Sequence, residues 1–489
     1  MFSRVAIVGN LLNESVREKV LKEITPTDEE IRNQEEMIAK LSTQLRRYSK
    51  RLGIDYESIE AHGSTGKKQT QLRGSSDIDL FVILNPDDYR RIISMPQDKR
   101  DRQISQLLDG FVDNWFYPAL EKLEPTKIQK TYSDHPYLSL QLQGQEIDVV
   151  SCFRLSKEEI ASEGPITAVD RTLHHTDYIL QHLKGDMRSD IRILKSFVRA
   201  AHVYGDKCAV GRMGFTGYAL ELLVTEFGDF EGAVERIRIL EKNPVDPANR
   251  SLHELRGKQE FHDDYIFIID PTDFNRNVAS SFDSRGYKWL KLRCKELTKA
   301  AEEIEENRLI QFLLEEKIPI EPLPDWLKPH SLAVEFQSKQ TVHYTILRDK
   351  LYKVTSKIVI RMENERTGEK RFGKTIGELY FEKNRYAIGF LVERDSISSE
   401  YDRKGPPVDM EEACREFSKA NSNVFEQQGY LWSKEKREFK SADAFLEHLI
   451  KEESIDGLER VQKSTVSDRV LNTLYRYVMQ VEDFPVEKR

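Results

Sequence analysis

The residues best suited to chemistry lie in the segment AHGSTGKKQTQLRGSSDIDLFVIL, residues 61–84. Its pattern predicts a strand, a turn, a basic loop and a second strand that carries Asp77 and Asp79. Side chains two apart on a strand point to the same face, so these carboxylates project together. Neighbouring carboxylates repel each other unless a cation lies between them, and hard oxygen ligands suit Mg²⁺. The spacing therefore predicts a metal site.

A phosphate-binding turn precedes these acids. Gly63 and Ser64 can offer backbone N–H groups and a hydroxyl to phosphate, and Lys67 or Lys68 adds positive charge. A phosphate cradle combined with metal-binding carboxylates predicts nucleotidyl transfer. The alternative is an ordinary Asp-x-Asp on an exposed strand face. The acids open an apolar run, however, where an unpaired charge near the core is unfavourable.

Two-metal phosphoryl chemistry calls for a further carboxylate, because the attacking and the leaving oxygen both need a metal. The apolar, β-branched segment QEIDVVSCFRL, residues 145–155, predicts a strand beside the first one. Glu146 and Asp148 share one of its faces, and either could be the third ligand. Asp148 lies deeper in the apolar run. The alternative is a charged residue on an edge strand.

With these motifs the chain resembles the archaeal-type (class I) CCA-adding tRNA nucleotidyltransferases of the polymerase-β nucleotidyltransferase superfamily. The matching segments, in order, are Gly63-Ser64, Leu72-Arg73-Gly74, Asp77-Ile78-Asp79, IDVVSC at 147–152, AVDRTLHHT at 168–176, RILKSFVRAAHVY at 192–204, GFTGYALELL at 214–223, DPTDFNRNVA at 270–279 and GPPV at 405–408. The segment at 430–449 also looks like the family's C-terminal part. The resemblance thus covers nearly the whole chain.

The resemblance implies an α+β multidomain protein. Its parts would be a polymerase-β-like nucleotidyltransferase head with a mixed sheet and helices (1–155), a helical central nucleotide- and tRNA-binding domain (156–318), and an α/β C-terminal tRNA-binding body and tail (319–489). The implied activity is template-independent addition of C, C and A to the 3′ end of tRNA from CTP and ATP. Mg²⁺ is the implied cofactor and a homodimer the implied assembly.

The resemblance also assigns roles to residues. It implies that Asp77, Asp79 and Asp148 are the catalytic metal ligands. The implied nucleotide-binding residues are Gly63, Ser64, Lys67, His175, Lys195, Tyr204 and Arg276. In the family the histidine, lysine and tyrosine hold the phosphates and sugar of the incoming nucleotide, and the arginine reads the base edge together with tRNA backbone phosphates. Gly214 and Gly217 would allow close backbone approach near that pocket.

Composition sets broad limits. The 489 residues suffice for three or more domains, no run has the length of a transmembrane helix, and the N-terminus lacks a signal pattern. The four cysteines are scattered, which indicates neither a zinc site nor a disulfide framework. We therefore expect a cytoplasmic protein without membrane contact. The net charge of -8 describes the whole surface rather than any one site.

Further elements follow from periodicity. Residues 1–50 are helical in period with Thr27 as a helix start, and 188–203 carry an apolar helical stripe. One long helix is predicted at 287–314 and a domain boundary at the Pro-rich segment 319–329. The basic and aromatic stretch 353–394 alternates as a strand-rich sheet would, and is either a tRNA contact or a solvated sheet face. Helices are predicted at 410–427 and 441–451.

Two other functions stay open. A poly(A) polymerase, or an oligoadenylate or cyclic-dinucleotide synthase of the same superfamily, would share the three acids. An inactive tRNA-binding scaffold is the alternative from another class. The presence of all three acids and the phosphate loop argues against the scaffold.

Overall fold

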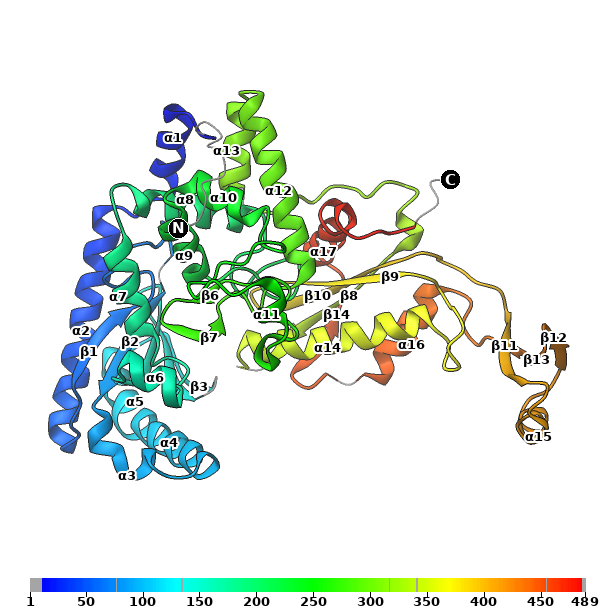
Figure 1. Cartoon of the computed structure of the whole chain (residues 1–489), viewed down its shortest axis with the longest axis horizontal. Coiled ribbons are helices and arrows are strands. Elements are labelled where there is room, and N and C mark those ends of the chain that lie inside the picture. The colour runs from blue at the N-terminus through cyan, green and yellow to red at the C-terminus, as the bar shows by residue number, and fades with distance from the viewer. Residues whose placement is uncertain are drawn as a thin grey trace. The chain divides into compact units, whose positions relative to one another are not determined.

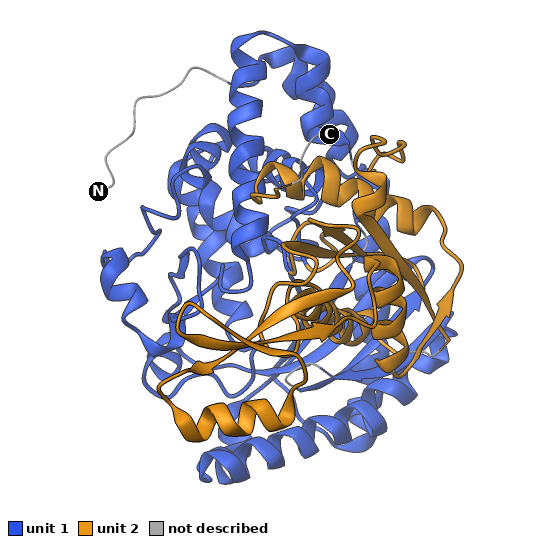
Figure 2. Cartoon of the chain, turned by 90° about the vertical axis from the view of Figure 1, so that its right-hand side faces the viewer, with its two compact units in different colours: residues 1–205, 213–316 blue, residues 206–212, 317–489 orange. Residues whose placement is uncertain are grey.

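The computed structural model describes residues 11–75, 77–132, 135–315, 317–339, 342–453 and 455–485. Residues 1–10, on which the prediction of an absent signal segment rests, lie outside the described residues. The chain forms two compact units, residues 1–205 with 213–316 and residues 206–212 with 317–489 (Figure 2). The three-part division predicted from the sequence stays a prediction.

A five-stranded mixed sheet forms the head of the first unit. Its strands are β1 (Ser58–His62), β2 (Ile78–Leu84), β3 (Lys127–Tyr132), β4 (Pro136–Leu142) and β5 (Gln145–Phe153). The order is β1-β2-β5-β4-β3; β2 and β5 run parallel, and the other neighbours are antiparallel. The predicted strand at 145–155 does lie beside the strand that carries Asp79. This confirms the predicted α+β class with a mixed-sheet head.

Helices cover this sheet and close its core. They are α2 (Asp28–Leu52), α3 (Arg90–Ile93), α4 (Gln97–Phe111), α5 (Tyr117–Leu120) and α6 (Lys157–Glu163). The first helix, α1 (Glu14–Ile24), packs instead on the later helical segments 187–200 and 306–314. Thr27 caps α2 in a reciprocal capping box with Glu30, as the sequence predicts. Figure 1 shows α2 running alongside β1. Trp115 is buried in this core, and its indole N–H donates to the carbonyl of Leu45 at 2.8 Å.

The rest of the first unit is mainly helical. Its elements are α7 (Thr172–His182), α8 (Met187–Ala200), α9 (Gly217–Phe227), α10 (Phe230–Ile237), α11 (Leu252–Arg256), the hairpin β6 (Ile269–Asp270) and β7 (Asp273–Asn277), α12 (Ser284–Glu302) and α13 (Glu306–Leu314). The predicted apolar stripe of α8 is buried, which confirms it. The prediction of one helix over 287–314 is wrong, because Ile304 adopts a left-handed φ of 54° between α12 and α13.

The second unit contains two antiparallel sheets. Its elements are β8 (Ser331–Ser338), α14 (Tyr344–Glu363), β9 (Thr375–Glu382), β10 (Arg385–Val392), β11 (Glu400–Pro407), α15 (Glu411–Ala420), β12 (Val424–Gln427), β13 (Tyr430–Lys436), α16 (Ala442–Glu452), β14 (Leu458–Val461) and α17 (Thr465–Arg476). The sheets have the orders β14-β8-β10-β9 and β11-β13-β12. Alternate residues of β10 face opposite sides, so Phe390 packs in the core with α14 while Ala387 packs with Val470 of α17.

Two sequence predictions in this unit need correction. The stretch 353–394 is not strand-rich throughout, because residues 353–363 belong to α14, whose Leu351, Val354 and Ile358 are buried at helical spacing. The helix predicted at 410–427 ends at Ala420, and Val424–Gln427 forms β12. The helix predicted at 441–451 is confirmed as α16. No helix in the described part of the chain has the length and apolar character to cross a membrane.

Candidate active site

Two of the three predicted acids lie side by side on neighbouring strands. Asp79 of β2 and Asp148 of β5 are register partners in the parallel pair. The prediction that Asp77 also lies on this strand is wrong, because β2 begins at Ile78 and Asp77 lies in the loop directly before it. Glu146, the alternative third acid, is exposed and lies one residue outside the part of β5 that pairs with β2. The geometry therefore favours Asp148 over Glu146.

The electrostatics of these carboxylates show mutual repulsion. Burial and the neighbouring Asp77 carboxylate raise the pKa of Asp79 to about 6, against the opposing charge of Lys68. Burial also raises the pKa of Asp148 to about 6; a hydrogen bond from Ser139 opposes this rise, and the charges of Asp79 and Asp77 add to it. Asp79 and Asp148 thus resist ionisation, first because they are buried and second because neighbouring carboxylates repel their charge. A divalent cation fits this set of hard oxygen donors.

The carboxylates do not form a closed cage. Among the residues that the structure describes, no group of three or more His, Cys, Asp or Glu side chains is arranged to hold a metal ion by itself. Magnesium-like ions in nucleotide enzymes are typically held by one or two carboxylates, with water and substrate phosphates completing the shell. The pair of Asp79 and Asp148 matches that kind of open site.

The Gly63-Ser64 turn lies directly against the Asp79 carboxylate. Gly63 has a φ of 68°, and a Cβ there would lie 2.2 Å from Oδ2 of Asp79. Only glycine permits this approach. The Thr65 hydroxyl donates to the carbonyl of Asp77 at 2.9 Å, and the Thr70 amide donates to the carbonyl of Ser64 at 3.0 Å. These bonds hold the turn across the start of β2.

The two lysines of the basic loop have different environments. Lys67 is exposed and its Nζ lies 2.6 Å from Oε2 of Glu60. Lys68 is only 5% exposed, and its Nζ lies 2.6 Å from Oε2 of Glu221. The charge of Lys68 also lowers the pKa of Asp79, which places it within electrostatic reach of the carboxylates.

Lys195 meets the same glutamate from α8. Its Nζ lies 2.8 Å from Oε1 of Glu221 and also donates to the carbonyl of Thr70 at 3.1 Å. Burial opposes the ionisation of Glu221, but the two lysines outweigh it and lower the pKa of the carboxyl. Two buried ammonium groups and one buried carboxylate leave a local charge of one positive unit. Lys195 is thus part of a buried cluster with Lys68, Thr70 and Glu221.

Tyr204 lies beside this cluster. A Cβ on Gly217 would lie 3.0 Å from the Tyr204 hydroxyl and 3.5 Å from Cε of Lys195. The absence of a side chain at Gly217 therefore lets the tyrosine and the lysine approach the start of α9, which confirms the predicted close approach at this glycine. Burial raises the pKa of the Tyr204 phenol, so it stays a neutral hydrogen-bonding group.

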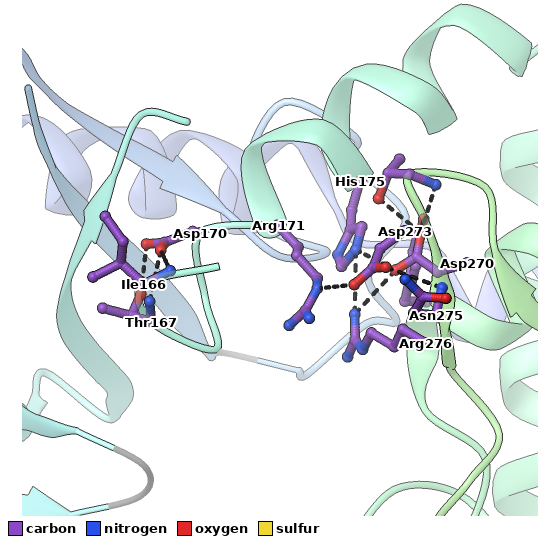
Figure 3. A network of polar contacts seen from close by, with 11 residues as sticks. Ile166, Thr167, Asp170, Arg171, His175, Asp270, Asp273, Asn275 and Arg276 are labelled. Atoms are coloured by element: carbon purple, nitrogen blue, oxygen red, sulfur yellow. Dashed lines mark hydrogen bonds and ion pairs between the residues drawn. The ribbon is translucent and has the colours of Figure 1, made fainter. Parts of the chain in front are cut away.

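The remaining two predicted residues, His175 and Arg276, meet at Asp270 of the β6–β7 hairpin (Figure 3). His175 Nε2 lies 2.7 Å from Oδ2 of Asp270, and Nη1 of Arg276 lies 3.2 Å from the same oxygen. The imidazole also stacks on the ring of Tyr218, with 4.0 Å between centroids. Burial lowers the pKa of His175 despite the nearby carboxylate, which favours a neutral ring.

Two buried acids of this site were not predicted from the sequence, and one buried lysine was predicted only as an alternative. Lys68 was left as an alternative to Lys67, and Glu221 and Asp270 received no role. A signal existed for both acids, since each lies in a quoted motif, GFTGYALELL and DPTDFNRNVA. Glu221 interrupts an apolar helix, where a charge requires a partner. Its partners come from distant segments, so the sequence alone could not name them.

Two family models match the chain in the regions just described. The model described as nucleotidyltransferase domain matches residues 38–174, which include all three candidate metal ligands. The model described as tRNA nucleotidyltransferase, second domain, matches residues 189–305, which include Lys195 and Arg276. Enzymes of the nucleotidyltransferase superfamily generally use divalent metal ions.

Individual relatives are similar over half or most of the chain. The CCA-adding enzyme of Methanothermobacter thermautotrophicus is 32% identical over 262 residues, which are 54% of this chain and 51% of that protein. The CCA-adding enzyme of Archaeoglobus fulgidus is 26% identical over 438 residues, 87% of each chain. The match thus spans about half the length of the first relative and most of the second. Among solved structures, E. coli MS115-1 CdnC with ATP matches with a TM-score of 0.45 and 15% identity over 63% of this chain and 99% of that chain.

Proposed function

We propose that this chain, which belongs to the archaeal-type CCA-adding nucleotidyltransferases, adds C, C and A to the 3′ end of tRNA from CTP and ATP without a nucleic acid template. The observation that carries the proposal is the register pairing of Asp79 with Asp148 beneath the Gly63 turn. This arrangement supports a nucleotidyl-transfer centre. The substrates follow from the named relatives.

We assign Asp77, Asp79 and Asp148 as the ligands of Mg²⁺. When bound there, Mg²⁺ would lower the pKa of the tRNA 3′-hydroxyl and stabilise the departing pyrophosphate. The carboxylates themselves orient the site, because β2 and β5 fix Asp79 and Asp148 in one register. Their raised pKa values support a site built to receive positive charge.

The triphosphate is assigned to the turn and the buried cluster. Backbone N–H groups at Gly63 and Ser64 would bind phosphate oxygens, and Lys195 with Tyr204 would hold phosphates and sugar. Between the loop lysines, the burial of Lys68 and its action on Asp79 support Lys68 as the phosphate contact. Lys67, which pairs with Glu60, then stays at the rim of the site.

The base is assigned to Arg276, with His175 on the phosphate side. A guanidinium presents a planar fork of donors that suits both a base edge and tRNA backbone phosphates. The Arg276 side chain is 38% exposed, so its remaining N–H groups are available to a substrate. We further propose the tRNA acceptor end as the partner, a homodimer as the assembly and the cytoplasm as the location.

The test is incubation of the purified chain and Mg²⁺ with tRNA that ends before CCA. CTP and ATP are supplied together and each of the four nucleotides separately, and the products are read by 3′-end sequencing. We expect CCA and nothing longer from the mixture. A homopolymer of A would instead indicate a poly(A) polymerase, and a short product formed without tRNA would indicate an oligonucleotide or cyclic-dinucleotide synthase. No product under any condition would leave the scaffold interpretation.

A further inference from the structure

Asp270 is completely buried, yet five polar hydrogens converge on it. Its Oδ1 accepts from the Tyr218 hydroxyl at 3.2 Å and from the Thr272 amide and hydroxyl at 2.9 and 2.7 Å. Its Oδ2 accepts from His175 Nε2 at 2.7 Å and from Arg276 Nη1 at 3.2 Å. These contacts lower the pKa of Asp270 despite its burial, with the hydrogen bond from His175 making the largest contribution.

The hydrogen-bond roles of His175 and Arg276 are mutually dependent. Their nitrogens Nε2 and Nη1 lie only 3.2 Å apart. Arginine always donates, so a protonated Nε2 cannot accept from it. Two donors can stay this close when both point at one carboxylate oxygen, and Oδ2 of Asp270 supplies that oxygen. Without the carboxylate, the arrangement would require Nε2 to lose its proton and accept from Arg276.

We propose that Asp270 is a positioning residue that couples phosphate recognition by His175 to base-edge recognition by Arg276. The inference rests on the proposed function for the roles of these two partners. Asp270 would fix the tautomer of His175, with the proton on Nε2, and would aim the guanidinium of Arg276 from one anchor point. A movement of His175 or Arg276 on nucleotide binding would then change the position of the other residue, because both bond Oδ2 of Asp270.

The simpler explanation is that Asp270 only stabilises the β6–β7 hairpin. The same hairpin supplies a matched comparison in Asp273, which is also buried and lies 2.6 Å from Nε of Arg171 (Figure 3). Asp273 accepts from Arg171 and from the Asn275 amide rather than from His175 or Arg276. Removal of its charge therefore disturbs the hairpin without touching the two nucleotide-binding residues.

The kinetic experiment compares Asp270→Asn with Asp273→Asn in single-turnover incorporation of CTP, ATP, UTP and GTP on tRNA that ends before the missing nucleotide. Loss of a charge-assisted hydrogen bond is worth about a tenfold effect. Asp270→Asn is expected to raise the KM for CTP and ATP about tenfold, and to lower discrimination against UTP and GTP about tenfold, with a smaller change in kcat. Asp273→Asn is expected to keep wild-type discrimination. Equal effects of the two variants on KM and discrimination would mean that Asp270 is only a hairpin anchor.

A spectroscopic measurement separates this inference from the proposed function. Imidazole ¹⁵N NMR, with the His175 signal assigned through His175→Gln, reports which ring nitrogen carries the proton. Nε2 is expected to be protonated in the wild type and in Asp273→Asn, and to lose its proton in Asp270→Asn. A wild type that adds no CCA would refute the proposed function and leave this readout intact. An unchanged His175 signal in Asp270→Asn would overturn the positioning role.

Discussion

Asp79 and Asp148 lie side by side on two parallel strands, where their negative charges repel each other. Substitution of either acid tests whether they form one metal site. Asp79→Asn or Asp148→Asn is expected to abolish addition of both C and A, because both nucleotides use one metal site. Binding of tRNA should stay nearly intact. The measurement is primer extension together with a filter-binding titration of tRNA.

Glu146→Gln is the matched control for Asp148→Asn. Glu146 shares a face of β5 with Asp148 but is exposed and lies outside the segment paired with β2. It should retain C and A addition. A variant at Asp79 or Asp148 that loses only one of the two additions would refute the single-site interpretation.

The raised pKa values of these acids also predict a stability change. The folded chain binds a proton on Asp79 more tightly than the unfolded chain, so this contribution to stability is complete below about pH 4 and is lost as the pH rises through about 6. Without metal, Asp79→Asn is therefore expected to raise the free energy of unfolding by about 2–3 kcal/mol at pH 8 and by little at pH 4, since each tenfold change in proton affinity is worth about 1.4 kcal/mol.

Urea denaturation in a chelating buffer at pH 4.0 and 8.0 checks this prediction, with unfolding signals followed by fluorescence. Addition of Mg²⁺ should stabilise the wild type at pH 8 and narrow the difference from Asp79→Asn, because the ion binds only the intact acid set. If Asp79→Asn raised the free energy of unfolding equally at both pH values, the ionisation of Asp79 would not be the cause of the stabilisation.

Single residues with a fixed local role were predictable from the sequence, whereas their partners were not. The period of two and the apolar run predicted the strands of Asp79 and Asp148, although β2 begins only after Asp77 and β5 ends at Phe153. The lysine that contacts the buried cluster was left undecided between two neighbours. Lys68 and Glu221 are 153 residues apart, and no local pattern reports a contact at that separation.

At the scale of elements, Glu221 of α9 joins α8 to the basic loop. It is 1% exposed and bonds both Lys195 and Lys68. Glu221→Gln would leave two buried ammonium groups without a counter-charge, and removal of one member of a buried ionic cluster typically costs about 3–5 kcal/mol. We therefore expect a loss of that size in the free energy of unfolding, measured by urea denaturation.

Lys195→Met provides the comparison for Glu221→Gln. It removes one cation and leaves Glu221 paired with Lys68, so the destabilisation should be clearly smaller. Glu226→Gln, on the same helix and bonded to the Tyr178 hydroxyl, controls for the loss of a carboxylate from α9. A Glu221→Gln variant as stable as Glu226→Gln would show that the lysines find other partners.

The element predictions succeeded where local chemistry marks both ends of an element. The capping residues Thr27 and Glu30 predict the start of α2. The apolar stripe of Ile191, Leu194 and Phe197 predicts α8. The break between α12 and α13 escaped prediction, because Ile304 adopts a left-handed conformation that β-branched residues rarely take. Packing of α13 on α8 accompanies that break, with the Ser196 hydroxyl donating to the carbonyl of Leu313 at 2.6 Å.

At the scale of the whole molecule, a net charge of -8 must be reconciled with an RNA substrate. Exposed positive charge at one place on the surface can bind RNA despite a negative total. In the basic stretch 353–394, some basic side chains are exposed and others are buried. Arg371 is buried, with its guanidinium 3.4 Å from the ring centroid of Phe445, so it serves the core of the second unit. Nη1 of Arg361 lies 2.5 Å from Oε2 of Glu452, so its charge is already paired within the second unit. Arg366 and Lys370 are exposed on the turn between α14 and β9.

The double variant Arg366→Glu with Lys370→Glu therefore tests whether this stretch contacts tRNA. Phosphate contacts release counterions, so loss of each contact should lower the slope of log affinity against log salt by about 1 and weaken binding most at low salt. The affinity for free ATP should not change. Lys99→Glu with Arg102→Glu, on exposed positions of α4, makes the same net charge change elsewhere. Filter binding of tRNA at several salt concentrations is the measurement. Equal weakening by both double variants would trace the effect to net charge, and an unchanged slope for the first would leave the stretch as a solvated surface.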